Sequence, residues 1–184
     1  MSGAWETFKA DAARWLVPEQ IGDPNEVSGL RALALLRLYR PLRPVALFRF
    51  GQWGRDRGIR GLAWLVQEQL QGRYGLDLPV STEIGPGFYL AHPTGVSITA
   101  ARIGANATLV GALTIGVNGH GNEPRIGDFV YLGAGCRVIG DIVLGDHVTV
   151  GANSVVNSDV ADHLTVVGAP AKPTAKSLKA AEER

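Results

Sequence analysis

The sequence contains little that could cross-link the chain or carry it into a membrane. Cys136 is the only cysteine among 184 residues, which excludes a disulfide framework and a cysteine-rich metal cluster. No apolar run reaches the roughly 18 residues that a membrane span requires, and residues 1–19 lack the uninterrupted apolar core of a signal peptide. The formal net charge is only +1, which gives no sign of nucleic-acid binding. We therefore expect a protein of the reducing cytoplasm.

Glycine, by contrast, is abundant and unevenly spread. Most of the 24 glycines follow residue 84 and recur at fixed intervals, whereas the earlier part of the chain shows helical periods. This change predicts an N-terminal helical region at residues 1–75, a repetitive domain at residues 76–173 and a C-terminal tail at residues 174–184.

Helical periods in the first region predict four helices, at residues 5–17, 27–39, 45–53 and 59–74. Pro18 follows the first helix, and Pro41 and Pro44 break the chain between the second and the third, because proline cannot continue a regular helix.

Arginine crowds the same region. Between residues 29 and 60 a single acidic residue, Asp56, accompanies eight arginines: Arg31, Arg37, Arg40, Arg43, Arg49, Arg55, Arg57 and Arg60. Two interpretations stay open. Basic, apolar helices can lie on an anionic membrane. Alternatively, the arginines form a solvated face or a subunit interface that pairs with acids elsewhere.

A six-residue repeat dominates the second region. Aliphatic residues recur at every sixth position in Ile126, Leu132, Val138, Leu144, Val150 and Val156. An earlier block keeps the step over Leu78, Ile84, Leu90 and Val96 and, after a slip of one residue, over Ile103, Leu109 and Ile115. Neither a helix nor an ordinary strand repeats every six residues. Three such units make a triangular coil of about 18 residues, and stacked coils pair their backbones. The pattern predicts a parallel β-helix, interrupted by a loop at residues 117–124.

Several motifs in this repeat resemble those of hexapeptide-repeat acyltransferases: residues 132–135 (LGAG), 150–153 (VGAN) and the terminating 167–172 (VGAPAK). Residues 87–96 (GFYLAHPTGV) are similar to the catalytic segment of the serine acetyltransferase branch and of its relatives that acetylate sugars. The resemblance covers roughly residues 75–173. It implies a mainly β fold, a left-handed parallel β-helix with an N-terminal α-helical extension, and a homotrimer that uses acetyl-CoA.

The resemblance assigns general-base catalysis to His92 and an orienting role to Asp77, fifteen residues earlier. A neutral imidazole can take the proton of an attacking alcohol, which contributes about 10² to 10⁴ in rate. His92 stands two residues after the inward Leu90, so we expect it at a corner with its side chain outward. The simpler alternatives are a turn contact for His92 and a cap at the β-helix entrance for Asp77.

By the same resemblance, acetyl-CoA lies in a groove between two β-helices. Ala134 and Ala152 would line the groove, and Gly116 or Val117 would lie near the thioester. Lys172 and Lys176 would meet the phosphates, or they belong to a solvated tail. The expected donor contacts are therefore Gly116, Val117, Ala134, Ala152 and Lys172. Cys136 falls at an inward position, so we interpret it as part of the core and not as a nucleophile.

The acceptor residues differ from those of the branch. Serine acetyltransferases place an aspartate directly before the base, where this chain has Ala91, and Arg-His before the loop proline, where this chain has Asn122 and Glu123. Without groups that read an ammonium and a carboxylate, a sugar or glycan hydroxyl is the expected acceptor, and serine is the alternative. His120 and Glu123 are further candidates for acceptor contact, although either could simply be solvated.

Two alternative functions belong to other classes. Zinc carbonic anhydrase chemistry requires three converging histidines, and His92, His120 and His147 are spaced unlike that family's ligands, so no metal is expected. A non-catalytic scaffold would lack affinity for CoA, and the intact segment around His92 speaks against it.

Overall fold

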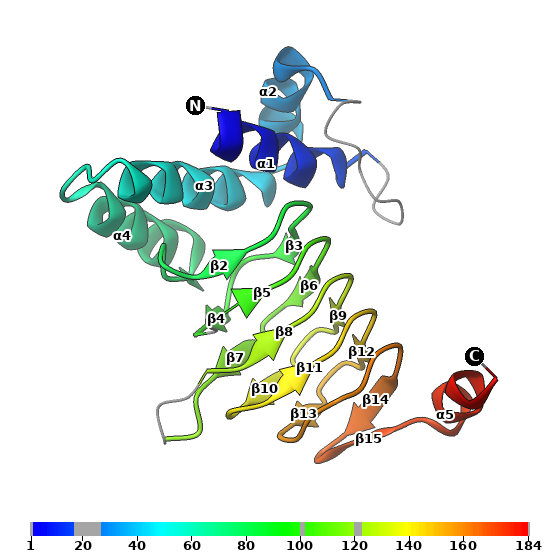
Figure 1. The fold of residues 1–184 in the computed structure, drawn as a ribbon. Coiled ribbons are helices and arrows are strands. Elements are labelled where there is room, and N and C mark those ends of the chain that lie inside the picture. Colours follow the sequence, from blue (N-terminus) through cyan, green and yellow to red (C-terminus); the bar gives the residue numbers. More distant parts are fainter. Residues whose placement is uncertain (1, 17–26, 100–101, 120–122, 184) are drawn as a thin grey trace.

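The computed structural model describes residues 2–16, 27–99, 102–119 and 123–183, which form a triangular stack of strands with helices at both ends (Figure 1). The helices are α1 (Ser2–Ala13), α2 (Gly29–Leu38), α3 (Leu42–Asp56), α4 (Leu62–Tyr74) and α5 (Ala175–Glu182). The first four gather at the end where the strands begin, and α5 lies at the opposite end, next to the C-terminus. None of the described helices is long and apolar enough to span a bilayer.

The strands follow one another around a triangle, so each of three sheets takes about every third strand. The first sheet holds β1 (Leu76–Asp77), β4 (Val96–Ile98), β7 (Thr114–Gly116), β10 (Arg137–Ile139) and β13 (Val155–Val156). The second holds β2 (Glu83–Ile84), β5 (Arg102–Ile103), β8 (Arg125–Ile126) and β11 (Val143–Leu144). The third holds β3 (Tyr89–His92), β6 (Thr108–Gly111), β9 (Tyr131–Leu132), β12 (Thr149–Val150), β14 (Thr165–Gly168) and β15 (Ala171–Pro173). Strands β14 and β15 pair antiparallel, whereas the other strand pairs of the described chain are parallel.

The predicted parallel β-helix and its six-residue step are confirmed. Leu109, Leu132 and Val150 stand in register on successive coils, and each is fully buried. All thirteen aliphatic residues named by the repeat are at most 7% exposed, and Cys136 joins them in the core. The loop predicted at residues 117–124 is also confirmed, because β7 ends at Gly116 and β8 begins at Arg125.

Carboxylates lock the coils together at the corner between the second and third sheets. Asp128 Oδ1 accepts the N–H of Ala105 at 2.7 Å, Asp146 Oδ1 accepts that of Asp128 at 2.7 Å, and Asp162 Oδ1 accepts that of Asp146 at 3.0 Å. Each aspartate therefore satisfies a backbone donor of the preceding coil. We call this edge the ladder corner (residues 85–88, 104–107, 127–130 and 145–148).

A buried ion pair fastens the helices to the first coil. Arg49 Nε donates to Asp11 Oδ2 at 2.8 Å, and the Arg49 guanidinium also donates to the carbonyls of Ile84 and Gly85 at 2.8 and 2.7 Å. Asp11 Oδ1 accepts the N–H of Phe88 at 2.8 Å. Burial raises the pKa of Asp11, and the Arg49 charge and the hydrogen bonds oppose that shift. Arg49 is therefore a structural residue, unlike the surface arginines that the sequence suggested.

Helix boundaries depart from the predicted ones at the prolines and glycines. Helix α3 begins at Leu42, so Pro44 lies in its first turn and does not break it. The N–H groups of a first turn have no partner within the helix, so proline loses nothing there. Helix α4 begins three residues later than expected, after Gly61, and ends at Tyr74, where Gly75 with φ 60° forms the C-terminal cap. Helix α1 begins and ends earlier than the predicted residues 5–17, because it spans Ser2–Ala13 and residues 14–16 form a turn. The C-terminal tail contains α5, capped by Thr174.

Candidate functional site

His92 is the last residue of β3, and its side chain is exposed at the corner between the third and first sheets, as predicted. It pairs with Gly111 on the next coil. The N–H of Gly135 bonds to the carbonyl of Gly111, and the N–H of Asn153 to that of Ala134, which continues the column through Ala134 and Ala152. We call this edge the His92 corner (residues 92–95, 111–113, 133–136 and 151–154).

Small residues beside His92 are required by the backbone. A Cβ added to Gly111, whose φ is 151°, would lie 2.7 Å from the carbonyl oxygen and 2.8 Å from the Cβ of His92. A Cβ on Gly133 would lie 2.7 Å from the backbone nitrogen of Ala152. Ala134 and Ala152 are themselves exposed. A strip of small residues thus leaves the His92 side chain accessible and runs along the corner toward the last coil.

Lys172 lies beside the far end of this strip. It is exposed on β15, where it pairs with Val167 of β14. Since Val166 of β14 pairs with Val150 of β12, the strip that begins at His92 passes through Ala152 to Gly168, next to this lysine. Three of the expected donor contacts, Ala134, Ala152 and Lys172, therefore share one edge of the molecule.

Asp77 is held by three side chains at the start of the β-helix. Its Oδ1 accepts hydrogen bonds from Gln71 Nε2 at 3.0 Å and Gln67 Nε2 at 3.4 Å, and its Oδ2 accepts one from Ser97 Oγ at 3.2 Å. Asp77 lies on the first sheet, whereas His92 lies where a strand of the third sheet ends, at the His92 corner. No hydrogen bond between the two side chains occurs in the part of the chain that the structure describes, and their pairing stays a prediction.

Sequence reasoning missed these partners of Asp77, although signals for them exist. Gln67 and Gln71 are four residues apart and share a face of α4. Ser97 stands about one coil after Asp77 and pairs with it directly. Coil periodicity places Ser97 beside Asp77, and helical periodicity places the two glutamines on one face of α4, but only the packing of α4 on the first coil brings them to the carboxylate.

The remaining expected contacts lie on the opposite edge of the first sheet. Gly116 is buried at the end of β7, Val117 is 40% exposed just beyond it, and Glu123 is half-buried where the chain returns. His120 lies outside the described residues. We call this edge the loop corner (residues 78–82, 117–119, 123–124, 140–142 and 157–159). One chain alone therefore does not bring Gly116 and Val117 next to His92, whereas the half-buried Ala91 adjoins it.

The other two described histidines belong to the ladder corner and its continuation. The rings of Phe129 and His147 stack at 4.7 Å with an interplanar angle of 3°, and those of His147 and His163 stack at 4.7 Å and 11°. All three residues have a positive φ, as the tight corner requires. His92 and His147 occupy different corners of one chain, so these two described histidines do not converge on a common site.

The repeat and the fold have counterparts among known proteins. Residues 123–158 match the family model for the bacterial transferase hexapeptide (six repeats). The serine acetyltransferase of Helicobacter pylori (strain J99) is 32% identical over 146 residues, which cover 77% of this chain and 85% of that protein. The chain belongs to the serine acetyltransferase branch of the hexapeptide-repeat acyltransferases.

Other members of the branch are longer. The serine acetyltransferase of Escherichia coli (strain K12) is 32% identical over 133 residues, covering 70% of this chain and 49% of that protein, so the chain spans about half the length of that curated relative. Soybean serine acetyltransferase complexed with serine superposes with a TM-score of 0.73 at 31% identity, over 94% of this chain and 68% of that one. Neisseria gonorrhoeae serine acetyltransferase in complex with serine gives 0.77 at 28% identity, over 94% and 70%.

Proposed function

We propose that this protein transfers the acetyl group of acetyl-CoA to a hydroxyl group, with serine as the favoured acceptor. The observation that carries the proposal is the accessible His92 at the head of a strip formed by Gly111, Ala134 and Ala152. Membership in the branch supports the reaction class, and the serine complexes of related structures support the acceptor. Serine thus moves ahead of the sugar hydroxyl that the sequence alone favoured.

The chemistry is a direct transfer. The imidazole of His92 takes the hydroxyl proton while the oxygen attacks the thioester carbonyl carbon. The tetrahedral intermediate then collapses, the carbon–sulfur bond breaks, and the CoA thiolate leaves and receives the proton from the imidazolium. Holding both substrates at one corner makes the attack effectively intramolecular. Asp77, fixed by Gln71 and Ser97, would set the orientation of the imidazole, and backbone N–H groups would stabilise the oxyanion.

The donor fits the length of the strip. Four coil steps lead from His92 to Gly168, which at about 4.8 Å per step makes roughly 19 Å. An extended pantetheine arm covers a distance of this order. The thioester would lie at His92, the arm would follow the backbone beside Ala134 and Ala152, and the phosphates would reach Lys172.

A complete site in this proposal needs a second copy of the chain. The first sheet separates the His92 corner from Gly116, Val117 and Glu123, so those residues must come from a neighbour. A homotrimer meets the requirement, because each copy offers its His92 corner to one neighbour and its loop corner to the other. Sedimentation equilibrium should therefore give three times the chain mass.

Since acetyl-CoA is the donor, we place the reaction in the cytoplasm, with the helical end directed to the inner face of the membrane.

A sugar or glycan hydroxyl is the second acceptor candidate. The methyl group of Ala91 offers no charge to a serine ammonium, and Asn122 and Glu123 stand where the branch carries Arg-His. Initial rates of thiol release with serine and with a panel of sugars and glycans decide between the two. A higher kcat/KM for any neutral sugar than for serine would assign the acceptor to the second candidate.

Substitution of the base tests the mechanism. We expect His92→Asn to lower kcat by about 10² or more while CoA still binds, because only proton transfer is lost. The matched control is His163→Asn, which changes an exposed histidine of the ladder-corner stack and keeps a residue that tolerates positive φ. If His92→Asn transfers acetyl groups within a few-fold of the unmodified protein, the catalytic assignment is wrong.

A further inference from the structure

The helical end exposes large apolar side chains. Of the fourteen such side chains that are exposed in the described parts of the chain, nine lie between residues 5 and 65. Leu30, Leu33 and Leu38 of α2 are 83, 54 and 71% exposed, and Trp64 of α4 is 67% exposed. Apolar patches of this kind on a protein surface mark contact with another molecule.

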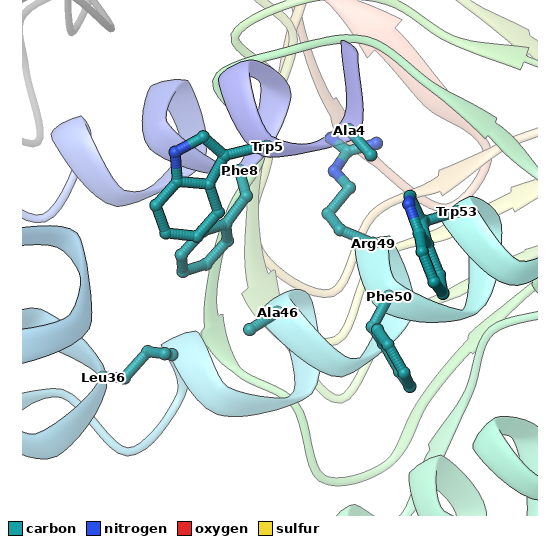
Figure 2. Close-up of a pocket in the computed structure, with 8 residues that line it drawn as sticks. All are labelled: Ala4, Trp5, Phe8, Leu36, Ala46, Arg49, Phe50 and Trp53. Atoms are coloured by element: carbon teal, nitrogen blue, oxygen red, sulfur yellow. The ribbon is translucent and has the colours of Figure 1, made fainter. Parts of the chain in front are cut away.

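Two adjoining hollows extend this apolar face into the helical region. The first, of about 640 Å³, lies between α1 and α3, and Figure 2 shows the rings that surround it: Trp5, Phe8, Phe50 and Trp53. The second, of about 670 Å³, is lined by residues of α2, α3 and α4. Leu36, Ala46 and Phe50 line both hollows, and we call the two adjoining hollows together the recess. Leu33 lines the second hollow and connects the recess to the exposed leucines of α2.

The rim of the recess is basic. Arg37, Arg43 and Arg73 line the second hollow, and no acidic residue lines either one among the described side chains. Arg31 and Arg40 are exposed at the two ends of α2. Asp56, the one acid between residues 29 and 60, already pairs with Arg55 at 2.8 Å. The surface therefore combines exposed apolar groups with positive charge.

We propose that the helical end docks on the surface of a bilayer that contains anionic lipid. The leucines of α2 and the recess would enter the boundary between headgroups and acyl chains, while the arginines would meet lipid phosphates. Long arginine side chains reach the charged layer even when their stems lie against apolar surface.

Charge decides between a lipid surface and a second copy of this chain. A two-fold pairing of this face would bring the same basic rim from each copy together, and arginine would oppose arginine. An anionic lipid neutralises the rim, and its flexible acyl chains can fill a concave apolar recess. The proposal does not depend on acetyl transfer.

Vesicle flotation of the full chain tests the proposal. We expect at least about tenfold more protein on vesicles of equal parts phosphatidylcholine and phosphatidylglycerol than on phosphatidylcholine alone, and less binding as salt rises. The double variant Leu30→Glu, Arg31→Glu should lose about tenfold or more of this binding, because it removes apolar contact and reverses a charge. Acidic residues suit the first turn of a helix, so α2 should persist. Circular dichroism verifies that it does.

The matched control is the double variant Leu178→Glu, Lys179→Glu, which makes the same change on the exposed α5 at the other end of the molecule. It should bind anionic vesicles as the unmodified chain does. Equal binding to neutral and anionic vesicles, no binding to either, or an equal loss in both double variants would each overturn the proposal. So would a dimerisation of trimers that the α2 variant abolishes in the absence of vesicle binding.

Discussion

The two ends of this chain are stabilised by different kinds of contact. In the β-helix, the same contact recurs on each coil, as in the buried Leu109, Leu132 and Val150 column and in the aspartates of the ladder corner. At the helical end each contact is unique and joins distant residues: Asp11 and Arg49 are 38 positions apart. When one of a set of repeated contacts is lost, the equivalent contacts on the neighbouring coils remain, whereas a unique contact has no substitute. Sensitivity to substitution should therefore differ between the regions.

The largest expected effect comes from breaking the ion pair between the regions. Arg49→Met leaves the fully buried Asp11 carboxylate without its partner, and we expect a loss of about 3 to 5 kcal/mol in the free energy of unfolding. Urea denaturation measures the change.

The control for that substitution is Arg55→Met, which removes the exposed pair with Asp56 and one hydrogen bond to the carbonyl of Val80. Exposed pairs contribute about 1 kcal/mol or less. A comparable loss in the free energy of unfolding in the two variants would mean that the buried pair does not hold the helices on the first coil.

A smaller effect contrasts glycines of the two regions. Gly133→Ala should destabilise the β-helix by about 1 to 3 kcal/mol, because its Cβ would meet the backbone of Ala152 at 2.7 Å. Gly72→Ala in α4 should instead stabilise the chain by about 0.5 to 1 kcal/mol, because nothing lies within 4 Å and alanine favours helix. Thermal unfolding of both variants checks the opposite signs, and two shifts of the same sign would contradict the comparison.

The effect that is smallest at neutral pH concerns the pH dependence of the β-helix core. Burial raises the pKa of Cys136 from 9.0 to about 11, so the folded chain keeps a proton that the unfolded chain releases above pH 9. Stability should therefore be unaffected by this thiol below pH 9 and fall as the pH rises from 9 to 11, by about 1 kcal/mol at pH 10.

Replacement by alanine isolates this contribution. Cys136→Ala should show a shallower decline in the free energy of unfolding between pH 8 and 10 than the unmodified chain. Val130→Ala, also a buried inward position, should leave the decline unchanged. Identical slopes for all three proteins would show that the thiol does not titrate in this way.

The contrast between regions also explains what the sequence could reveal. In the β-helix, local spacing determines which side faces inward, so the burial of Leu132, the outward His92 and the loop after Gly116 were all predictable. The Asp11–Arg49 pair was not predictable, because no local pattern relates residues so far apart. Arg49 was therefore expected at the surface, although the structure buries it.

The residues of the candidate site likewise fall into those that were predictable and those that were not. The resemblance located His92, Ala134 and Ala152, and the structure arranges them along one corner. It also predicted Gly116 and Val117 for the same groove, but periodicity cannot say that these residues occupy the opposite edge of the first sheet. Of the partners of Asp77, Ser97 follows from coil register, whereas Gln67 and Gln71 of α4 required the packing of helix against β-helix to be known.

The number of coils sets the length of the strip that starts at His92. Each coil adds one fixed increment of about 4.8 Å between the imidazole and Lys172. Inserting or deleting a whole coil between Gly111 and Ala134 would change that separation by one increment and leave the geometry of each remaining corner intact. In proteins built in this way, the distance between the reacting group and a distant ligand contact can change in evolution by whole coils, while the end where the reaction takes place stays the same.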